Sequence, residues 1–343
     1  MKITHIHIER FRGFQNEDFE VGSLLTAIAG QNGTQKSTLL GIITQTFTLK
    51  TEDSMRVEKP LCGGSYISAF KDKFRLSPTF DKPKGHEWTI SFDAGMDDFT
   101  VESIKRTGDP NVRFWKKGAR QEGDGYISFP TIFLSLKRLV PVAEEAKIIT
   151  DDTLLTQEEL NEFKQLHNKI LIAQTPISSA TTITSKNKQS IGVSTELYDW
   201  NQNSMGQDNL GKIILALFSF KRLHDKYPRQ YKGGILAIDE MDATMYPASQ
   251  VELLKVLRKY ASKLNLQILF TTHSEEFNKD YVVFVEKGTN TASAAIYNAN
   301  DKGEGKLTQI TSEEEWTMLE EMLDDYYNNQ ENGCGGSCES CSG

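Results

Sequence analysis

The sequence is poor in cysteine and has no long apolar run. Of its four cysteines, Cys62 stands alone and Cys334, Cys338 and Cys341 fall in the last ten residues. This pattern excludes a disulfide framework and predicts a reducing compartment, the cytoplasm. No apolar run approaches the roughly 18 residues that a membrane span needs, and the first residues lack the apolar core of a signal peptide. We therefore expect no membrane association.

A basic excess is also absent. The 343 residues include 39 Lys and Arg against 47 Asp and Glu, a net charge of −8. A protein-wide basic coat for nucleic acid is excluded, although a local basic strip is not. The length corresponds to about two domains and is ample for a buried core.

The first half of the chain reads as a parallel α/β opening followed by an antiparallel insert. Residues 24–29 form an apolar run that ends in a glycine-rich turn, and residues 36–47 carry apolar side chains at helical spacing. Residues 2–10 and 86–130 alternate between apolar and polar positions, which is typical of half-buried antiparallel strands. A buried strand follows at residues 131–136.

The second half alternates between helices and strands. Thr156 and Glu159 predict a capping box at the start of a helix over 156–173. Ten of the 21 residues from Thr175 to Thr195 are Ser or Thr, which predicts a mobile loop or a polar hairpin. Further periodicity predicts helices over 206–223 and 249–264, strands over 234–238 and 266–272, weaker strands near Val282 and Ala294, and a last helix from Ser312.

These segments predict an α/β protein with a parallel core sheet, an inserted antiparallel β lobe and a helical lobe. We place its parts at residues 1–140 (a lobe that includes the glycine-rich turn and the β insert), 141–225 (a helical lobe), 226–327 (the rest of the core) and 328–343 (a flexible tail rich in Cys, Gly and Ser).

A phosphate-binding motif occupies the turn between the first core strand and its helix. In such a loop the backbone N–H groups cradle phosphates, the lysine reaches the β- and γ-oxygens, and the following hydroxyl holds Mg²⁺. Lys36 and Ser37 fit the last two roles, and we expect Lys36 to face solvent when no nucleotide is bound. The predicted nucleotide-binding residues are Gly30, Gln31, Asn32, Gly33, Thr34, Gln35, Lys36, Ser37 and Thr38.

Charged and polar side chains follow the two later core strands. The strand over 234–238 ends in Asp239 and Glu240, and the strand over 266–272 is followed by His273. Open α/β sheets bind ligands at the carboxyl ends of their strands. We predict that Asp239 joins Ser37 in holding Mg²⁺, that Glu240 orients an attacking water, and that His273 contacts the γ-phosphate.

A fourth motif precedes the acidic strand. Ser204, Gly206 and Gln207 open a helix, which taken alone is a helix cap that leaves N–H groups open to an anion. In this order the four motifs resemble the ATP-binding-cassette ATPases of the SMC/RecF/OLD group. The run from Ile8 to Phe14 is similar to the start of RecF-type ATPases, and residues 239–247 resemble the D-loop region of the OLD branch.

The resemblance implies a head-to-tail dimer around two nucleotides. Ser204, Gly206 and Gln207 then belong to the signature motif, which binds the γ-phosphate held by the opposite protomer. Three positions depart from the family pattern: Gln35 replaces a glycine, Met205 replaces the first signature glycine, and no glutamine follows the strand that ends at Ser135. The role that this glutamine has in the family passes to Lys137 or Arg138, or is absent from this protein.

Two features of the sequence indicate which branch of this group the chain resembles. No sustained heptads predict a long coiled coil, and the 70 residues after His273 are too few for a nuclease domain of OLD type together with the remaining core. A nuclease effector, if one exists, is then a separate chain.

Three weaker patterns have ordinary explanations as well as functional ones. The basic residues of the β lobe favour a solvated face over nucleic-acid contact; they are Lys105, Arg106, Arg113, Lys116, Lys117 and Arg120. His5 and His7 share a strand face, which favours a solvent-facing pair over metal ligands. The three tail cysteines lack a fourth metal ligand.

The sequence thus predicts an ATP- and Mg²⁺-dependent ATPase that works as a homodimer switch. We expect a DNA-associated or antiphage role through a separate effector, with possible direct contact to DNA. Two alternatives stay open: an assembly scaffold that binds ATP with little hydrolysis, which Gln35 favours, and the ATP-binding subunit of a transporter.

Overall fold

The computed structural model describes most of the chain. The described residues are 1–29, 33, 35–67, 70–77, 79–93, 95–105, 112–118, 125–139, 147–151, 154–173, 175–185, 189–272, 281–287, 291–299 and 305–310. The predicted last helix from Ser312 and the three tail cysteines lie outside these residues.

A seven-stranded sheet forms the centre, in the order β17-β16-β15-β3-β14-β13-β9. Its parallel part comprises β3 (Leu25–Ala29), β14 (Leu266–Thr272), β13 (Gly234–Ile238) and β9 (Thr131–Leu134). An antiparallel meander, β15 (Tyr281–Lys287), β16 (Thr291–Ala299) and β17 (Gly305–Ile310), extends it beyond β3. The expected strands near Val282 and Ala294 are thus present, and β17 is an additional one.

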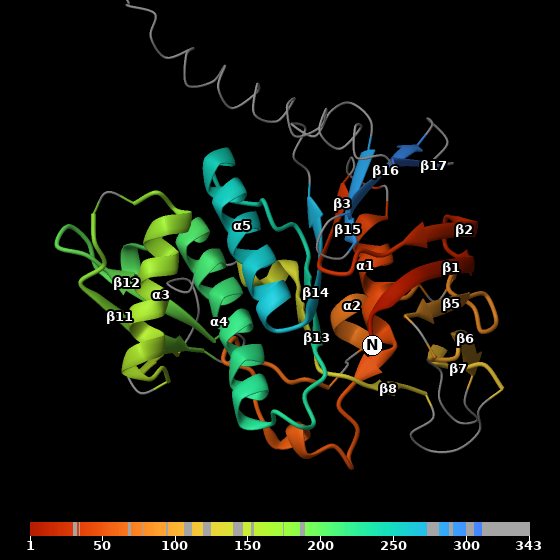
Figure 1. Ribbon diagram of the computed structural model, residues 1–343, viewed down its shortest axis with the longest axis horizontal. Helices are drawn as coiled ribbons and strands as arrows, with labels where there is room; N and C mark the ends of the chain where they lie inside the picture. Colours follow the sequence, from red (N-terminus) through yellow and green to blue (C-terminus); the bar gives the residue numbers. More distant parts are fainter. Residues whose placement is uncertain are drawn as a thin grey trace, which may run out of the picture.

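Both faces of the parallel sheet are buried, and most of its strand residues are apolar. Along β13, Leu236 and Ile238 pack into one hydrophobic cluster, whereas Ile235 and Ala237 pack into another. The first cluster lies under α3 (Gln157–Ile170), α4 (Met205–Lys226) and α5 (Pro247–Lys263). The second lies under α1 (Lys36–Gln45) and the antiparallel lobe, on the opposite side (Figure 1).

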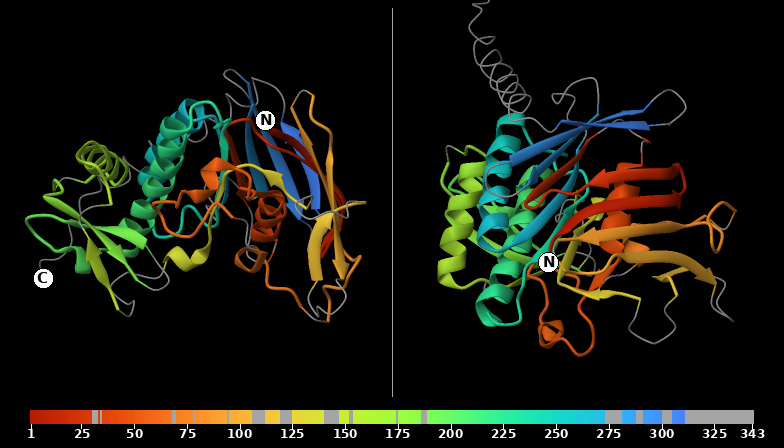
Figure 2. Two further views of the ribbon diagram at one scale, coloured as in Figure 1. Left: turned by 90° about the horizontal axis from the view of Figure 1, so that it is seen from below. Right: turned by 45° about the vertical axis from the view of Figure 1, so that its right-hand side comes forward.

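The antiparallel lobe is a five-stranded sheet in the order β2-β1-β5-β6-β7. It contains the expected strands of residues 86–130, β5 (Glu87–Phe92), β6 (Phe99–Lys105) and β7 (Val112–Lys116). The amino-terminal hairpin, β1 (Ile3–Phe11) and β2 (Phe14–Glu20), completes it, with β1 antiparallel to β5. Figure 2 shows this sheet as a layer of its own on the far side of α1.

The helical lobe also contains a small sheet. The Ser/Thr-rich segment is a polar hairpin, β11 (Ser179–Thr184) and β12 (Gln189–Ser194), and β10 (Ile149–Asp151) pairs with β11. The predicted capping box is present, since Thr156 Oγ1 accepts from the Glu159 N–H and the Glu159 carboxylate accepts from the Thr156 N–H. Among the described residues, the short elements are β4 (Phe47–Thr48), β8 (Ile127–Ser128), α2 (Phe70–Lys73) and three 3₁₀ turns at Ser54–Val57, Leu136–Leu139 and Trp200–Gln202.

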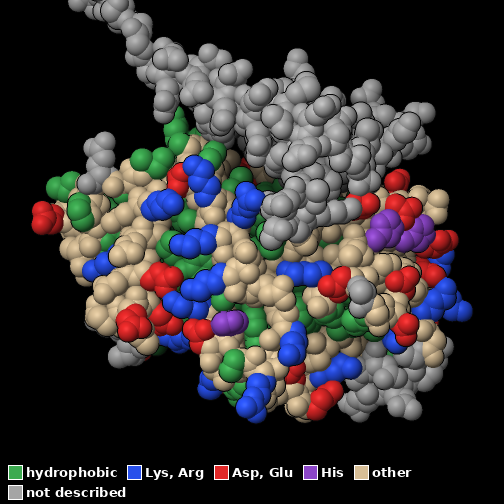
Figure 3. Space-filling view, viewed as in Figure 1, with side chains coloured by type: hydrophobic (Ala, Val, Ile, Leu, Met, Phe, Trp, Pro, Cys, Tyr) green, Lys and Arg blue, Asp and Glu red, His purple; other side chains and the backbone are tan. Residues whose placement is uncertain are grey.

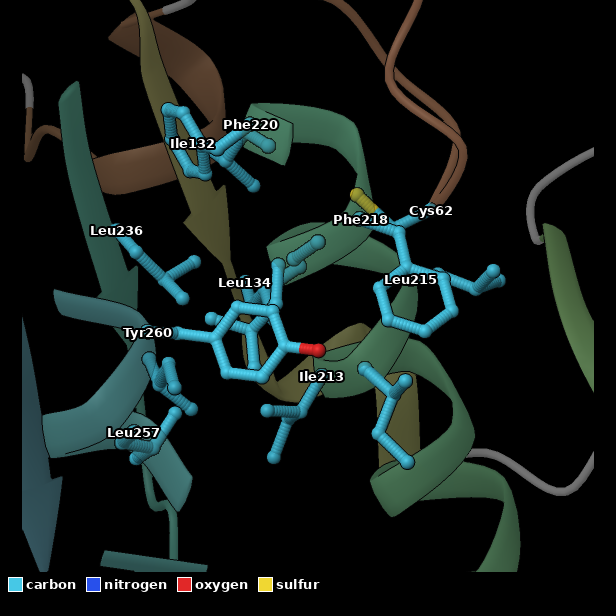
Figure 4. Packing of buried hydrophobic residues seen from close by; sticks show 14 of the residues in the cluster. Cys62, Ile132, Leu134, Ile213, Leu215, Phe218, Phe220, Leu236, Leu257 and Tyr260 are labelled. Carbon is cyan, nitrogen blue, oxygen red and sulfur yellow. The ribbon is translucent and has the colours of Figure 1, made fainter. Parts of the chain in front are cut away.

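The larger cluster surrounds α4, whose buried side chains meet β9, β13 and α5 (Figure 4). Cys62 belongs to it, and burial raises the pKa of its thiol to about 11. A buried thiol with a raised pKa is a packing residue and is inert as a nucleophile. None of the described helices is long and apolar enough to cross a membrane.

His167 on α3 is a buried histidine, with 1% of its surface exposed beside Phe163. Within the described part of the chain, neither ring nitrogen has a hydrogen-bond partner. Burial lowers its pKa to about 4, so the folded protein holds the neutral ring.

We expect His167 to make the fold sensitive to acid. The unfolded chain binds a proton at this histidine below about pH 6.5, whereas the folded chain does so only near pH 4. Stability should therefore fall by on the order of 3 kcal/mol as the pH drops from 7 to 4. Urea unfolding across this range should show a flatter pH profile for His167→Phe than for wild type. The half-exposed His224 provides the control, His224→Phe, which should keep the wild-type slope.

Candidate functional site

The carboxyl ends of β3, β13 and β14 meet the amino terminus of α1. At this junction the Ser37 hydroxyl donates to Asp239 Oδ1 at 2.7 Å, across 202 positions of sequence. The contact joins two residues that the sequence analysis assigned to one metal site. Because the parallel strands are hydrogen-bonded in register, their ends reach the same edge of the sheet.

Thr271, the penultimate residue of β14, completes this junction. Its Oγ1 donates to Asp239 Oδ1 at 2.7 Å and accepts from the Glu240 N–H at 2.6 Å. Asp239 is therefore oriented by two hydroxyls, and the backbone of Glu240 is fixed to the neighbouring strand. The sequence motifs do not include Thr271. The signal that could have found it is a pair of hydroxyl residues, Thr271 and Thr272, at the end of a mostly apolar strand.

Lys36 is buried, with 7% of its surface exposed, so the expectation that it faces solvent is wrong. Burial lowers the pKa of its ammonium group, and the carboxylates of Glu240, Asp239 and Asp242 oppose this shift. The physical reason is its position in the first turn of α1, where the acidic end of β13 attracts the side chain inward.

Gln35 has a left-handed backbone, with φ 68° and ψ 21°, and lies directly before α1. Its Oε1 accepts from the Gly13 N–H at 3.2 Å, so the side chain is held by the β1–β2 turn. Gly13 leaves room for it, because a Cβ there would lie 2.0 Å from Gln35 Nε2. The β1–β2 turn also contacts α1 itself, because Arg12 Nη1 donates to Thr38 Oγ1 at 3.1 Å.

Ser204 caps α4, as its sequence position predicts. Its Oγ accepts from the Gln207 N–H at 3.3 Å, and the Ser204 N–H donates to Gln207 Oε1 at 2.8 Å. Gln207 Nε2 also donates to the Tyr198 hydroxyl. A Cβ on Gly206 would lie 2.5 Å from the Thr244 carbonyl oxygen, so glycine allows α4 to approach the segment after β13.

Lys137 and Arg138 are the two residues expected to replace the missing glutamine. Arg138 is buried, and Lys137 is exposed. The Arg138 guanidinium donates to Asn209 of α4 and to the Glu240 carbonyl oxygen. Burial lowers its pKa to about 10, against the attraction of Asp239, Glu240 and Asp242. Asn209 was also not selected from the sequence, and its position inside a helix gave no signal.

The remaining predicted site residues are only partly described. Gly33 is an exposed turn residue with φ 84°, a conformation that favours glycine. Gly30, Gln31, Asn32, Thr34 and His273 lie outside the described residues. For these five positions the predicted roles stay predictions.

The two weaker surface patterns have internal partners. His5 Nε2 and His7 Nδ1 both contact Asp18 Oδ1, at 2.7 and 2.9 Å. Figure 3 shows histidine side chains bordered by acidic ones over β1 and β2. No group of three or more potential metal ligands occurs in the part of the chain that the structure describes.

In the basic strip of the β lobe, Lys117 pairs with Glu87, and the Lys116 ammonium lies over the Phe99 ring. Arg106 and Arg120 lie outside the described residues.

Residues 135–277 match the family model of the AAA ATPase domain. The chain carries an ATPase domain. This match confirms the ATPase that the ordered motifs predict, and the observed architecture confirms the predicted α/β fold class.

A second relationship covers a shorter stretch. A UPF0473 protein of Leuconostoc mesenteroides is 30% identical over 92 residues, which cover 24% of this chain and 93% of that protein. A UPF0473 protein of Bacillus pumilus is 35% identical over 71 residues, covering 19% of this chain and 75% of that protein. Over that stretch the chain belongs to the UPF0473 family, which the sequence analysis did not detect.

Solved structures with a similar fold include two SMC heads and a recombination protein. The SMC head domain from Thermotoga maritima is 13% identical, with a TM-score of 0.46, and the match covers 91% of this chain and all of that one. An SMC head bound to the C-winged helix domain of ScpA is 14% identical, with a TM-score of 0.49 and coverage of 92% and 100%. The recombination mediator protein RecF-ATP is 13% identical, with a TM-score of 0.44 and coverage of 90% and 97%.

We expect Gln35→Gly to tighten ATP binding by the ATPase domain. Glycine adopts positive φ without a Cβ penalty and lets the loop backbone approach the phosphates. The gain should be about fivefold in the dissociation constant, which corresponds to roughly 1 kcal/mol. Titration calorimetry measures it. Gln35→Ala is the matched control, because it removes the bond to Gly13 but keeps the Cβ. A dissociation constant for Gln35→Gly that equals or exceeds the wild-type value contradicts the expectation.

Proposed function

We propose that this protein hydrolyses ATP to ADP and phosphate with the help of Mg²⁺. The observation that carries the proposal is the 2.7 Å hydrogen bond from Ser37 Oγ to Asp239 Oδ1, with Glu240 next along the chain. It joins the residues that a P-loop ATPase needs at one point of the sheet edge.

The donor set at this point fits a magnesium ion. Mg²⁺ prefers oxygen ligands, and it is commonly held by one or two protein oxygens together with phosphate. Ser37 and Asp239 would supply those oxygens here. The bound ion would neutralise negative charge that develops on the transferred phosphoryl group.

The chain's own residues supply the remaining functions. Lys36 places a positive charge at the first turn of α1, where its ammonium interacts with the β/γ-phosphates. The Glu240 carboxylate accepts a hydrogen bond from water and orients it for attack. The open N–H groups at the start of α1 add favourable partial charge toward the phosphates.

The dimer belongs to the same proposal. In a head-to-tail pair, Ser204, Gly206 and Gln207 of one protomer face the nucleotide held by the other. Met205 and Tyr246 support this arrangement, because both are exposed apolar side chains at the amino ends of α4 and α5. ATP binding would close the dimer and hydrolysis would open it. We propose that a separate effector, such as a nuclease, reads this switch in an antiphage or DNA-associated process.

We expect Lys36→Ala to abolish ATP binding. The substitution removes the positive charge on the β/γ-phosphates, and charge-assisted contacts of this kind are among the strongest available to a phosphate site. Titration calorimetry with ATP and Mg²⁺ should show no measurable heat of binding. Because Lys36 is buried, circular dichroism must accompany the titration to show that the variant is folded. ATP affinity within a few-fold of wild type would remove the P-loop assignment.

We expect Glu240→Gln to bind ATP normally and to hydrolyse it about 10²- to 10⁴-fold more slowly, since the amide is a poor base toward water. With hydrolysis blocked, the closed dimer should accumulate, and light scattering with ATP and Mg²⁺ measures it. Glu252→Gln on α5, where the carboxylate pairs with Lys169 and Lys255, is the control and should turn over at the wild-type rate. Wild-type turnover by Glu240→Gln would assign the water to another residue. If the wild-type protein binds ATP without releasing phosphate, the scaffold alternative replaces the hydrolase.

A further inference from the structure

Arg138 is a buried charge at the end of a core strand. It lies in the 3₁₀ turn Leu136–Leu139 that follows β9, and 1% of its surface is exposed. Its Nη1 donates to the carbonyl oxygens of Leu134 and Ser135, at 3.3 and 3.2 Å. Two donors of the same guanidinium leave this turn and reach other elements. A planar fork of fixed donors can hold two acceptors in one geometry.

One of these donors fixes the residue proposed to orient water. Arg138 Nη2 donates to the Glu240 carbonyl oxygen at 2.5 Å, while the Glu240 N–H donates to Thr271 Oγ1 at 2.6 Å. Both backbone polar groups of Glu240 are therefore held. Its φ is 51°, a left-handed conformation that is uncommon for a residue with a Cβ. This backbone conformation sets the direction of the Glu240 Cα–Cβ bond.

The other donor reaches the helix that carries the proposed signature motif. Arg138 Nε donates to Asn209 Oδ1 at 2.6 Å, and Asn209 Nδ2 donates to the Ala243 carbonyl oxygen at 3.0 Å. Arg138 and Asn209 therefore hold the turn after β13 at residues 240 and 243. Asn209 is fully buried in the second turn of α4, which begins just after Ser204.

The start of α4 also contacts this turn directly. A Cβ on Gly206 would lie 2.5 Å from the Thr244 carbonyl oxygen, so the helix and the turn have no free space between them. A shift of the amino terminus of α4 must therefore displace the turn or Asn209, and through Asn209 the guanidinium that holds Glu240.

We propose that Arg138 is a positioning residue for hydrolysis, which sets the direction of the Glu240 carboxylate and couples it through Asn209 to the amino terminus of α4. This inference rests on the proposed function. When a nucleotide on the opposite protomer contacts the Ser204–Gln207 segment, this coupling would change the geometry at Glu240 of the same chain.

A simpler role for Arg138 is charge balance, since Asp239, Glu240 and Asp242 lie near it. The two roles make different demands on the side chain. Charge balance needs one positive charge, which lysine supplies. Positioning needs two donors directed at Asn209 Oδ1 and Glu240 O, and a single ammonium on a flexible stem does not reproduce that fork.

The test measures steady-state phosphate release, ATP affinity by calorimetry and thermal melting for Arg138→Met and Arg138→Lys. Arg229→Met, the same change at an exposed position after α4, is the control and should match wild type. We expect Arg138→Met to lower kcat about 10- to 100-fold while the dissociation constant of ATP stays within about threefold. Arg138→Lys should recover the melting temperature but not kcat.

Combination with Glu240→Gln decides whether Arg138 acts through Glu240. In that case the double variant that carries both Arg138→Met and Glu240→Gln hydrolyses ATP as slowly as Glu240→Gln alone, because the group that Arg138 positions is already absent. Asn209→Asp provides a second route if Arg138→Met does not fold. It keeps the acceptor for Arg138 and loses the donor to Ala243 O, so kcat should fall, and circular dichroism shows whether the variant is folded.

Multiplicative losses in the double variant, or full recovery of kcat by Arg138→Lys, would overturn the positioning role and leave the proposed function intact. Absence of turnover by the wild-type protein would overturn both. Unchanged kcat in Asn209→Asp with normal folding would separate α4 from Glu240 and overturn the coupling.

Discussion

The hydrogen bond between Ser37 and Asp239 is the constraint on which the site depends. It joins the first turn of α1, the helix that follows β3, to the residue directly after β13. Thr271 adds the end of β14 to the same carboxylate oxygen. Three segments that are remote in sequence thus share one acceptor, and the position of each fixes the others. The hydrophobic clusters on the two faces of the sheet hold the strands in the register that makes this contact possible.

Charge is concentrated at this edge. Asp239, Glu240 and Asp242 follow β13, and all three attract the ammonium group of Lys36 and the guanidinium of Arg138. Burial lowers the pKa of both cations, and the three carboxylates oppose that shift. A buried cation that loses its carboxylates becomes unfavourable, so the local acidic turn and the two basic side chains stabilise one another. This interdependence explains why Lys36 turns inward.

The relationship to the UPF0473 family adds a feature that the ATPase motifs do not explain. The similarity covers 24% of this chain but nearly the whole of the smaller Leuconostoc protein. One polypeptide is therefore similar both to the AAA ATPase domain and, over a shorter stretch, to the UPF0473 proteins. Catalytic motifs give no indication of the second relationship, because a segment related to another family need carry no residues of recognisable chemistry.

Local sequence determined most of the secondary structure and the identity of the phosphate-binding elements. Periodicity located β3, α1, β13, α5 and β14, and capping residues located the starts of α3 and α4. These features depend on neighbours within one or two turns, so a single sequence contains them. The Ser/Thr-rich segment left two possibilities, and pairing between β11 and β12 decided for the hairpin.

Only the tertiary structure decided the contacts between distant elements. The inward Lys36, the Thr271 hydroxyl on Asp239, and the Arg138 fork between Asn209 and Glu240 all join residues far apart in the chain. Gln35 shows the same limit, because its departure from the glycine pattern was visible in the sequence but its bond to Gly13 was not. The local propensity of a segment for helix or strand contains no information on which distant side chains meet when the sheet forms. That is set by strand order, register and packing, and these exist only once the chain has folded.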